Sequence, residues 1–317
     1  MKARRYGILG TGALGGFYGA RLQKAGLEVH YLLHRDYEQV KQHGLVVESV
    51  DGDFNLPVVH AYASPEEMPR CDVIVVALKT TQNELLPELI PPIVQPGGIV
   101  LVLQNGLGIE AEVAAIAPEA HILGGLCFLC SNKVGPGHIR HLDYGQIVLG
   151  EYWAGDVPAG ITSRLEQVAE DFRQAGIPIQ VEPDLLLARW RKLVWNIPYN
   201  GLSVVLDAQT DEMMANPMTR SLATHLMQEV VAAAAGYGRV IPAEFIGTML
   251  THTDNMKPYR TSMKIDYDEG RPMEIETMYG NPLRAAQQAG VSTPRIEMLY
   301  QQLSFLDKMR FNVRKMG

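Results

Sequence analysis

The sequence predicts an α/β fold, with a parallel sheet in the N-terminal part of the chain and an all-helical domain after it. Two observations carry this prediction. Short apolar runs alternate with helical patterns up to about residue 181, as in a doubly wound sheet, and almost everything after Pro183 reads as helix. We therefore expect two domains, residues 1–183 and residues 184–317, which a chain of 317 residues is long enough to form.

A glycine-rich turn lies between the first predicted strand and the first predicted helix. The stretch Tyr6–Gly15 reads YGILGTGALG, and a second strand follows at Val29–Leu33. In such a strand–helix–strand unit, Gly10 permits the tight turn, Gly12 lets a pyrophosphate approach the backbone, and Gly15 lets the helix pack closely. The anion then meets the N–H groups and the positive dipole end of the helix. The pattern predicts a Rossmann-like dinucleotide site built from Gly10, Thr11, Gly12, Ala13, Leu14 and Gly15.

The residue after the second strand indicates which dinucleotide binds. Position 35 lies twenty residues beyond Gly15, where an NAD-specific site usually has an acidic residue for the ribose 2'-hydroxyl. The chain has Arg35 there, and a guanidinium can bind a 2'-phosphate with two parallel hydrogen bonds. This favours NADP (NADPH). The alternative interpretation is a solvated arginine followed by Asp36 as the cap of the next helix.

Two further buried strands place polar residues at their carboxyl ends. Asp72–Leu78 is followed by Lys79, and Ile99–Leu103 is followed within two residues by Asn105. Ligands of doubly wound sheets bind at that edge. We therefore expect Lys79 and Asn105 to face the bound nucleotide, although each could equally be a loop residue in water.

A polar stripe is predicted on the first helix of the second domain. Lys192, Asn196 and Asn200 are spaced i, i+4 and i+8, so they share one face of that helix. Asparagine is a poor helix former, which favours a stripe that lines a cleft over an exposed polar face. Pro198 predicts a kink between the two asparagines.

A second constellation follows near residue 270. Pro272 suits the first position of a helix, which would place Glu274 in the first turn, where the dipole favours its ionised form. A carboxylate there has two interpretations, a stabiliser of the helix or a catalytic group.

Composition excludes several function classes. The 28 basic and 35 acidic residues give a net charge of −7, so we expect no nucleic-acid partner. The longest apolar stretches are too short to span a membrane, and three cysteines are too few for a disulfide scaffold. These features favour the cytoplasm.

The four residues Cys127, Cys130, His138 and His141 superficially resemble a metal site. Each pair is spaced by three in a predicted strand, so its two members point to opposite faces. We therefore predict no metal.

The chain resembles the ketopantoate reductase (2-dehydropantoate 2-reductase) family over nearly its whole length. The segments that carry the resemblance occur in the family's order: Gly10-x-Gly12-x-x-Gly15, Ala77-Leu78-Lys79, Gln104-Asn105-Gly106, Lys192-Leu193-x-x-Asn196-x-x-x-Asn200, Ser262-Met263-x-x-Asp266 and Gly270-Arg271-x-x-Glu274-Ile275-Glu276-x-x-x-Gly280. The resemblance implies an NADPH-dependent reduction of 2-dehydropantoate to pantoate, a step of pantothenate biosynthesis, by a monomer or homodimer.

The resemblance also implies a role for each matching residue. The family's general acid matches Lys192, and the glutamate that holds the substrate and positions this lysine matches Glu274. Arg35 and Lys79 would hold the adenosine phosphate end of the cofactor. Residues matching family members that orient cofactor and substrate are Asn105, Asn196, Asn200 and Ser262.

Two positions depart from the family pattern, both on the substrate side. Tyr259 stands where relatives commonly have a substrate-contacting asparagine, and Pro198 interrupts the helix of Lys192. A reductase of a different 2-keto acid is therefore the nearest alternative. A non-catalytic NADP(H)-binding redox sensor is the other, but a sensor needs neither a general acid nor a substrate anchor.

Overall fold

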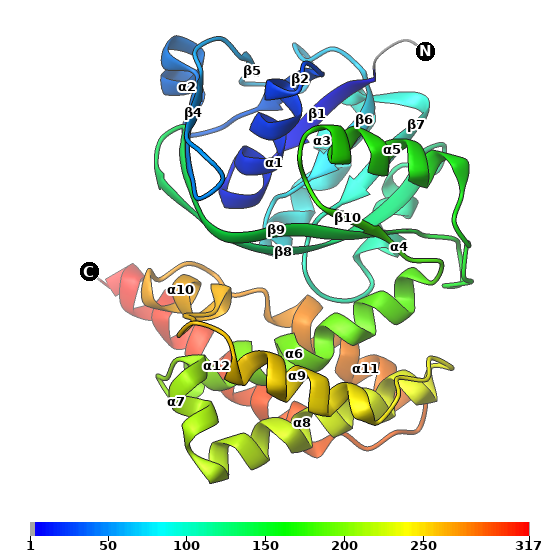
Figure 1. The fold of residues 1–317 in the computed structure, drawn as a ribbon, viewed down its shortest axis with the longest axis vertical. Coiled ribbons are helices and arrows are strands. Elements are labelled where there is room, and N and C mark those ends of the chain that lie inside the picture. Colours follow the sequence, from blue (N-terminus) through cyan, green and yellow to red (C-terminus); the bar gives the residue numbers. More distant parts are fainter. Residues whose placement is uncertain (1–3, 317) are drawn as a thin grey trace. The chain divides into compact units, whose positions relative to one another are not determined.

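The computed structural model describes residues 4–316 and divides the chain into two compact units (Figure 1). The sheet unit comprises the chain up to Gln104 together with Ile109–Leu185. The helical unit comprises the short segment Asn105–Gly108 and the chain from Leu186 onward. The chain therefore leaves the sheet unit for four residues and returns to it before the helical unit proper begins.

The sheet unit is built on one sheet, which has ten strands within the described residues. The strands are β1 (Arg5–Leu9), β2 (Glu28–Leu32), β3 (Leu45–Ser49), β4 (Phe54–Leu56), β5 (His60–Tyr62), β6 (Cys71–Val76), β7 (Val94–Val102), β8 (His121–Gly135), β9 (His138–Glu151) and β10 (Ile179–Val181). Their order is β4-β3-β9-β8-β7-β6-β1-β2-β5, with β10 beside β9. The pairs β3·β4 and β8·β9 are antiparallel and the other pairs are parallel.

Helices cover both faces of this sheet. They are α1 (Ala13–Lys24), α2 (Tyr37–His43), the 3-10 helix η1 (Thr80–Leu85), α3 (Leu86–Ile93), α4 (Ile109–Ile116) and α5 (Ser163–Gln174). Alternate residues of one strand enter different cores: Ile8 packs with α1 and α5, whereas Leu9 packs with α3 and α4. Burial on both faces explains why the central strands are continuous apolar runs. The predicted α/β fold is confirmed.

The described residues of the helical unit form helices and their connections. These helices are α6 (Leu185–Val205), α7 (Thr210–Ala215), α8 (Pro217–Gly236), α9 (Glu244–Asp254), α10 (Ser262–Asp268), the π-helix η2 (Glu276–Gly280), α11 (Asn281–Gln288) and α12 (Pro294–Met316). Their core contains the fully buried Trp190, Tyr199 and Tyr279. Of the helices that the structure describes, none combines the length and apolar character needed to cross a bilayer.

One local prediction for the helical unit is wrong. Pro272 does not begin a helix, because residues 271–274 are non-helical and helical structure starts at Ile275. Two carboxylates outside this segment hold it. The Met273 N–H donates to Asp307 Oδ1 of α12 at 3.1 Å, and Arg271 Nε donates to Asp266 Oδ1 of the preceding helix α10 at 2.8 Å. Tertiary contacts thus override the local preference of proline for a first helical turn.

A buried polar network ties β1 to α5 in the sheet unit. The Tyr6 hydroxyl donates to Asp171 Oδ2 at 2.6 Å, and Arg4 binds both oxygens of the same carboxylate at 2.7 and 2.9 Å. Burial, reinforced by the Asp171 carboxylate, raises the pKa of Tyr6 well above its ordinary value. The neutral phenol therefore remains a hydrogen-bond donor throughout the physiological pH range.

We predict that Asp171→Ala lowers the free energy of unfolding of the sheet unit by about 2–4 kcal/mol, because it leaves the buried Tyr6 hydroxyl without its acceptor. Urea denaturation followed by circular dichroism measures the change. Glu170→Ala, which removes an exposed carboxylate from the same helix, is the control and should change stability by less than about 0.5 kcal/mol. Equal effects of the two substitutions would contradict the prediction.

Candidate active site

The three glycines of the turn between β1 and α1 meet three different constraints. Gly10 has φ +93°, and a Cβ there would lie 2.6 Å from the backbone nitrogen of Leu78. A Cβ on Gly15 would overlap the carbonyl oxygen of Gly10. Gly12 differs, because a Cβ there meets nothing within 4 Å. Gly10 and Gly15 are therefore required by the fold, whereas Gly12 keeps space open in front of α1.

This open space fits the phosphates of a dinucleotide. It lies at the N-terminus of α1, whose first turn contains no acidic residue and no side-chain cap, so its N–H groups and dipole favour an anion. Thr11 supplies a second observation: its hydroxyl oxygen is buried and, among the described residues, has no hydrogen-bond partner. A phosphate oxygen at this turn would satisfy that hydroxyl.

The predicted edge of the sheet is formed as expected within the sheet unit. Leu9 of β1 pairs with Val76 of β6, and the Ala77 N–H donates to the Leu9 carbonyl at 2.8 Å, so both strands end at the same level. Lys79, which follows β6 and precedes η1, is exposed at this edge. Its contact with the cofactor stays a prediction.

Arg35 follows β2 and is exposed, as a residue that binds a cofactor phosphate must be. Asp36 occupies the N-cap position of α2, as the alternative predicts, but its side chain makes no cap hydrogen bond. The Asp36 carboxylate instead accepts from the Gly137 N–H at 3.0 Å and pairs with Lys133 Nζ at 2.6 Å. Binding of the 2'-phosphate by Arg35 stays a prediction.

Asn105 belongs to the helical unit, although the sequence predicts it beside Lys79 at the edge of the sheet. Lys192 Nζ donates to Asn105 Oδ1 at 2.9 Å. The next residues of the segment are fixed by Thr277: a Cβ on Gly106 (φ +110°) would lie 2.5 Å from that residue, and the Leu107 N–H donates to its carbonyl at 2.9 Å. The close packing fixes the amide against which Lys192 is oriented.

The two asparagines of the polar stripe on α6 are buried, and Lys192 is partly buried. Asn196 and Asn200 are 7% and 3% exposed, so the alternative of an exposed polar face is wrong. Asn200 Oδ1 accepts from the Met263 N–H at 3.3 Å and from the Ser262 hydroxyl at 3.5 Å, at the first turn of α10. These contacts bring Asn200 and Ser262 together. They also orient the Asn200 amide so that its nitrogen points away from α10.

Two buried hydroxyls that join α6 to α10 are not apparent from the sequence. Ser203 Oγ lies 2.8 Å from Thr261 Oγ1, both residues are fully buried, and Ser203 also donates to the carbonyl of Asn200 at 2.9 Å. Thr261 caps α10 by accepting from the Lys264 N–H at 3.2 Å. A threonine before a helical run signals the cap, but the partner from α6 has no local signal.

Glu274, the second predicted catalytic residue, is buried at 5% exposure immediately before the helical structure that starts at Ile275. Its carbonyl accepts from the Met278 N–H at 3.3 Å and so takes part in the first helical turn. Its side chain could position a neighbouring cation or accept a hydrogen bond from a hydroxyl group.

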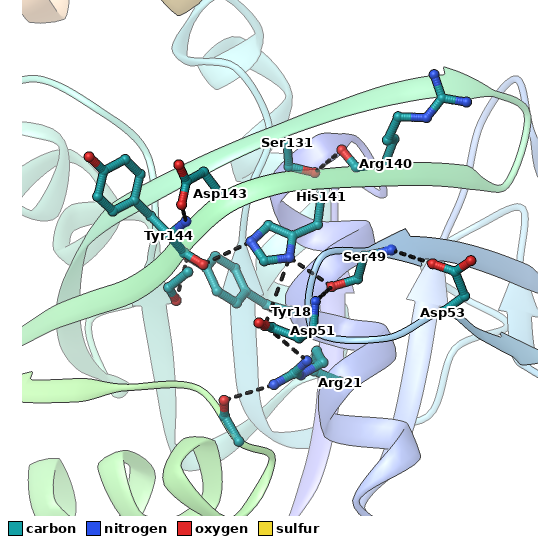
Figure 2. Close-up of polar contacts among 12 residues, drawn as sticks. Tyr18, Arg21, Ser49, Asp51, Asp53, Ser131, Arg140, His141, Asp143 and Tyr144 are labelled. Carbon is teal, nitrogen blue, oxygen red and sulfur yellow. Dashed lines mark hydrogen bonds and ion pairs between the residues drawn. The ribbon is translucent and has the colours of Figure 1, made fainter. Parts of the chain in front are cut away.

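Cys127 and Cys130 lie in β8, and His138 and His141 lie in β9, as the sequence predicts. Figure 2 shows that the His141 ring joins β9 to the end of β3: its nitrogens lie 2.8 Å from Ser49 Oγ and 2.8 Å from the Tyr144 carbonyl oxygen. This histidine has a structural role in the sheet unit.

Comparison with known proteins identifies the family. Residues 6–153 match the family model described as ketopantoate reductase PanE/ApbA, and residues 184–307 match its C-terminal counterpart. The chain belongs to the ketopantoate reductase family. It is therefore an oxidoreductase that uses a nicotinamide cofactor, and the predictions of activity class and cofactor are confirmed.

Individual relatives match along nearly their entire length. A 2-dehydropantoate 2-reductase from Nostoc sp. is 66% identical over 97% of this chain and 96% of its own. The crystal structure of 2-dehydropantoate 2-reductase from Geobacter metallireducens has 44% identity and a TM-score of 0.90 over 95% of this chain and 99% of its own. The corresponding structure from Methylococcus capsulatus has 32% identity and a TM-score of 0.89, and covers 96% and 97%.

We predict that Gly12→Ala leaves stability unchanged but raises the KM for NADPH by about tenfold or more, because the added methyl group occupies space needed by the phosphates. Thermal melting without cofactor and initial rates of NADPH oxidation measure the two effects. Gly15→Ala is the matched comparison, and it should lower the melting temperature because its Cβ overlaps the backbone. A Gly12→Ala variant with the wild-type KM would contradict the prediction.

Proposed function

We propose that the protein reduces 2-dehydropantoate to pantoate with NADPH, with Lys192 as the general acid and Glu274 as its catalytic partner. The observation that carries the assignment is the hydrogen bond from Lys192 Nζ to Asn105 Oδ1, at 2.9 Å. This hydrogen bond orients the ammonium group of Lys192. The ammonium group can therefore stabilise the oxygen of a ketone as negative charge develops there and then protonate it.

The proposed reaction balances with one hydride and one proton. The nicotinamide cofactor, when bound, supplies the hydride to the C2 carbon of the keto acid. Lys192 Nζ gives its proton to the C2 oxygen, which becomes the hydroxyl group of the product. Lys192 both protonates the C2 oxygen and stabilises the negative charge that develops on it. Loss of this residue should therefore lower the turnover rate more than it weakens cofactor binding.

The substrate carboxylate would be bound by neutral donors of α6 and α10. Asn200 presents its amide nitrogen because its oxygen is occupied by the Met263 N–H, and Ser262 adds a hydroxyl group from the first turn of α10. Asn196, one turn before Asn200 on the same face of α6, extends this set. Because these donors are uncharged, they would bind the substrate carboxylate without adding a further charge near the ammonium group of Lys192.

Glu274 would act on the other functional group of the substrate. A buried carboxylate accepts a strong hydrogen bond, so it can hold the terminal hydroxyl group of 2-dehydropantoate and position the Lys192 ammonium. The sheet unit would bind the cofactor through the glycine turn, Arg35 and Lys79. Domain roles follow: residues 1–183 bind NADP and residues 184–317 carry substrate and catalysis. We place the protein in the cytoplasm as a monomer or homodimer without a nucleic-acid partner.

We predict that Lys192→Ala lowers kcat by on the order of a hundredfold or more, because both the proton donor and the charge that stabilises the alkoxide are lost. The dissociation constant for NADPH, measured by fluorescence titration, should change by less than about threefold. Arg220→Ala is the control, since it removes a cation of the same unit that is paired with Asp254 on the surface. Wild-type turnover in Lys192→Ala would remove this lysine from the mechanism.

We predict that 2-dehydropantoate gives the highest kcat/KM among branched and unbranched 2-keto acids in an assay of NADPH oxidation at about 340 nm. The same assay with NADH should give at least about tenfold lower kcat/KM, because Arg35 then lacks its phosphate partner. A different preferred acid would leave the reductase chemistry intact but change the substrate. Tight NADPH binding without turnover of any acid would instead favour the redox sensor.

A further inference from the structure

The acidic residue that follows Arg35 is directed away from solvent. Asp36 is only 6% exposed, and its Cα lies about 3.8 Å from that of Arg35 because the two are consecutive. An acidic side chain at this end of β2 would bind the ribose 2'-hydroxyl of NAD and would repel a 2'-phosphate. The groups that occupy the Asp36 carboxylate therefore influence which cofactor can bind.

Both partners of Asp36 come from the hairpin formed by β8 and β9. Lys133 lies near the end of β8 and pairs with Asp36 Oδ2 at 2.6 Å, while Gly137 in the turn donates its N–H to the same oxygen at 3.0 Å. The turn is packed tightly on α2: Gly137 has φ +64°, and a Cβ there would lie 2.9 Å from Val40 Cγ2. Its carbonyl also accepts from the Val46 N–H at 2.9 Å.

The hairpin is anchored beside the glycine turn as well. A Cβ on Gly16, in the first turns of α1, would lie 2.7 Å from Ile139 of β9, so this strand lies directly against the helix. Ser131 of β8 reaches the carbonyls of Arg140 and Ala13, at 3.2 and 3.4 Å, and the first of these contacts is drawn in Figure 2. Lys133 is therefore held at the edge of the sheet unit that carries the dinucleotide motif.

We propose that Lys133 is a specificity-determining residue for the 2'-phosphate of the cofactor, acting together with Arg35 by neutralising Asp36. With Lys133 in place, the side chains of Arg35, Asp36 and Lys133 together carry one net positive charge beside the ribose. Without Lys133, the carboxylate cancels the charge of Arg35, and a 2'-phosphate loses its electrostatic attraction to this position. The inference rests on the proposed use of NADPH and concerns a residue outside the glycine turn.

The experiment compares kcat/KM for NADPH with kcat/KM for NADH in full-length variants. Lys133→Met should lower this ratio about tenfold, because Asp36 becomes an unpaired negative charge. Asp36→Asn should raise the ratio, because Lys133 then adds its charge to that of Arg35. The double variant Asp36→Asn with Lys133→Met should return close to the wild-type ratio. Arg140→Gln is the matched control, since this hairpin cation pairs with Glu48 and should not alter the ratio.

The two single variants shift the ratio in opposite directions, which a general loosening of the hairpin would not do. A Lys133→Met ratio equal to that of Arg140→Gln, or a lower ratio in Asp36→Asn, would overturn the proposal. Asp36→Asn leaves no unpaired buried charge, so it tests the proposal even where Lys133→Met fails to fold. If the protein reduces no keto acid, dissociation constants for NADPH and NADH replace the rates, which separates this inference from the proposed reaction.

Discussion

The packing of the segment Asn105–Gly108 against Thr277 is the constraint on which the candidate site depends. The segment follows the end of β7 after two residues, yet its backbone is bound within the helical unit through the hydrogen bond from Leu107 to Thr277. Gly106 makes this possible, since its positive φ and the nearness of Thr277 leave no room for a side chain. As a result, a residue delivered by a strand of the sheet orients the lysine of α6.

Patterns that repeat along the chain made most of the fold predictable. The apolar runs of the strands, the glycine turn and the i, i+4, i+8 spacing of α6 all depend on neighbours close in sequence, and all three are found in the structure. The helix start predicted at Pro272 failed because a distant partner, Asp307, accepts a hydrogen bond from the Met273 N–H.

The candidate site was predictable as a set of residues but not as a set of contacts. Spacing places Asn200 on the stripe of Lys192, but it does not reveal that the Met263 N–H occupies the amide oxygen of Asn200. Similarly, Arg35 can be identified from its spacing to the glycine turn, whereas the partners of Asp36 lie about a hundred residues away in the sequence, on the hairpin of β8 and β9. Hydrogen bonds between distant segments have no periodic signature, so their geometry requires the structure.

Lys192 and Lys133 have different hydrogen-bond partners and different proposed roles. Asn105 Oδ1 accepts a hydrogen bond from Lys192 Nζ and orients the ammonium group, whose charge can stabilise an oxygen that becomes negative during reduction. Asp36 instead offers Lys133 a carboxylate, so the pair as a whole is neutral and its effect on a ligand is to remove a repulsion. The same side chain therefore serves catalysis at one position and cofactor choice at the other.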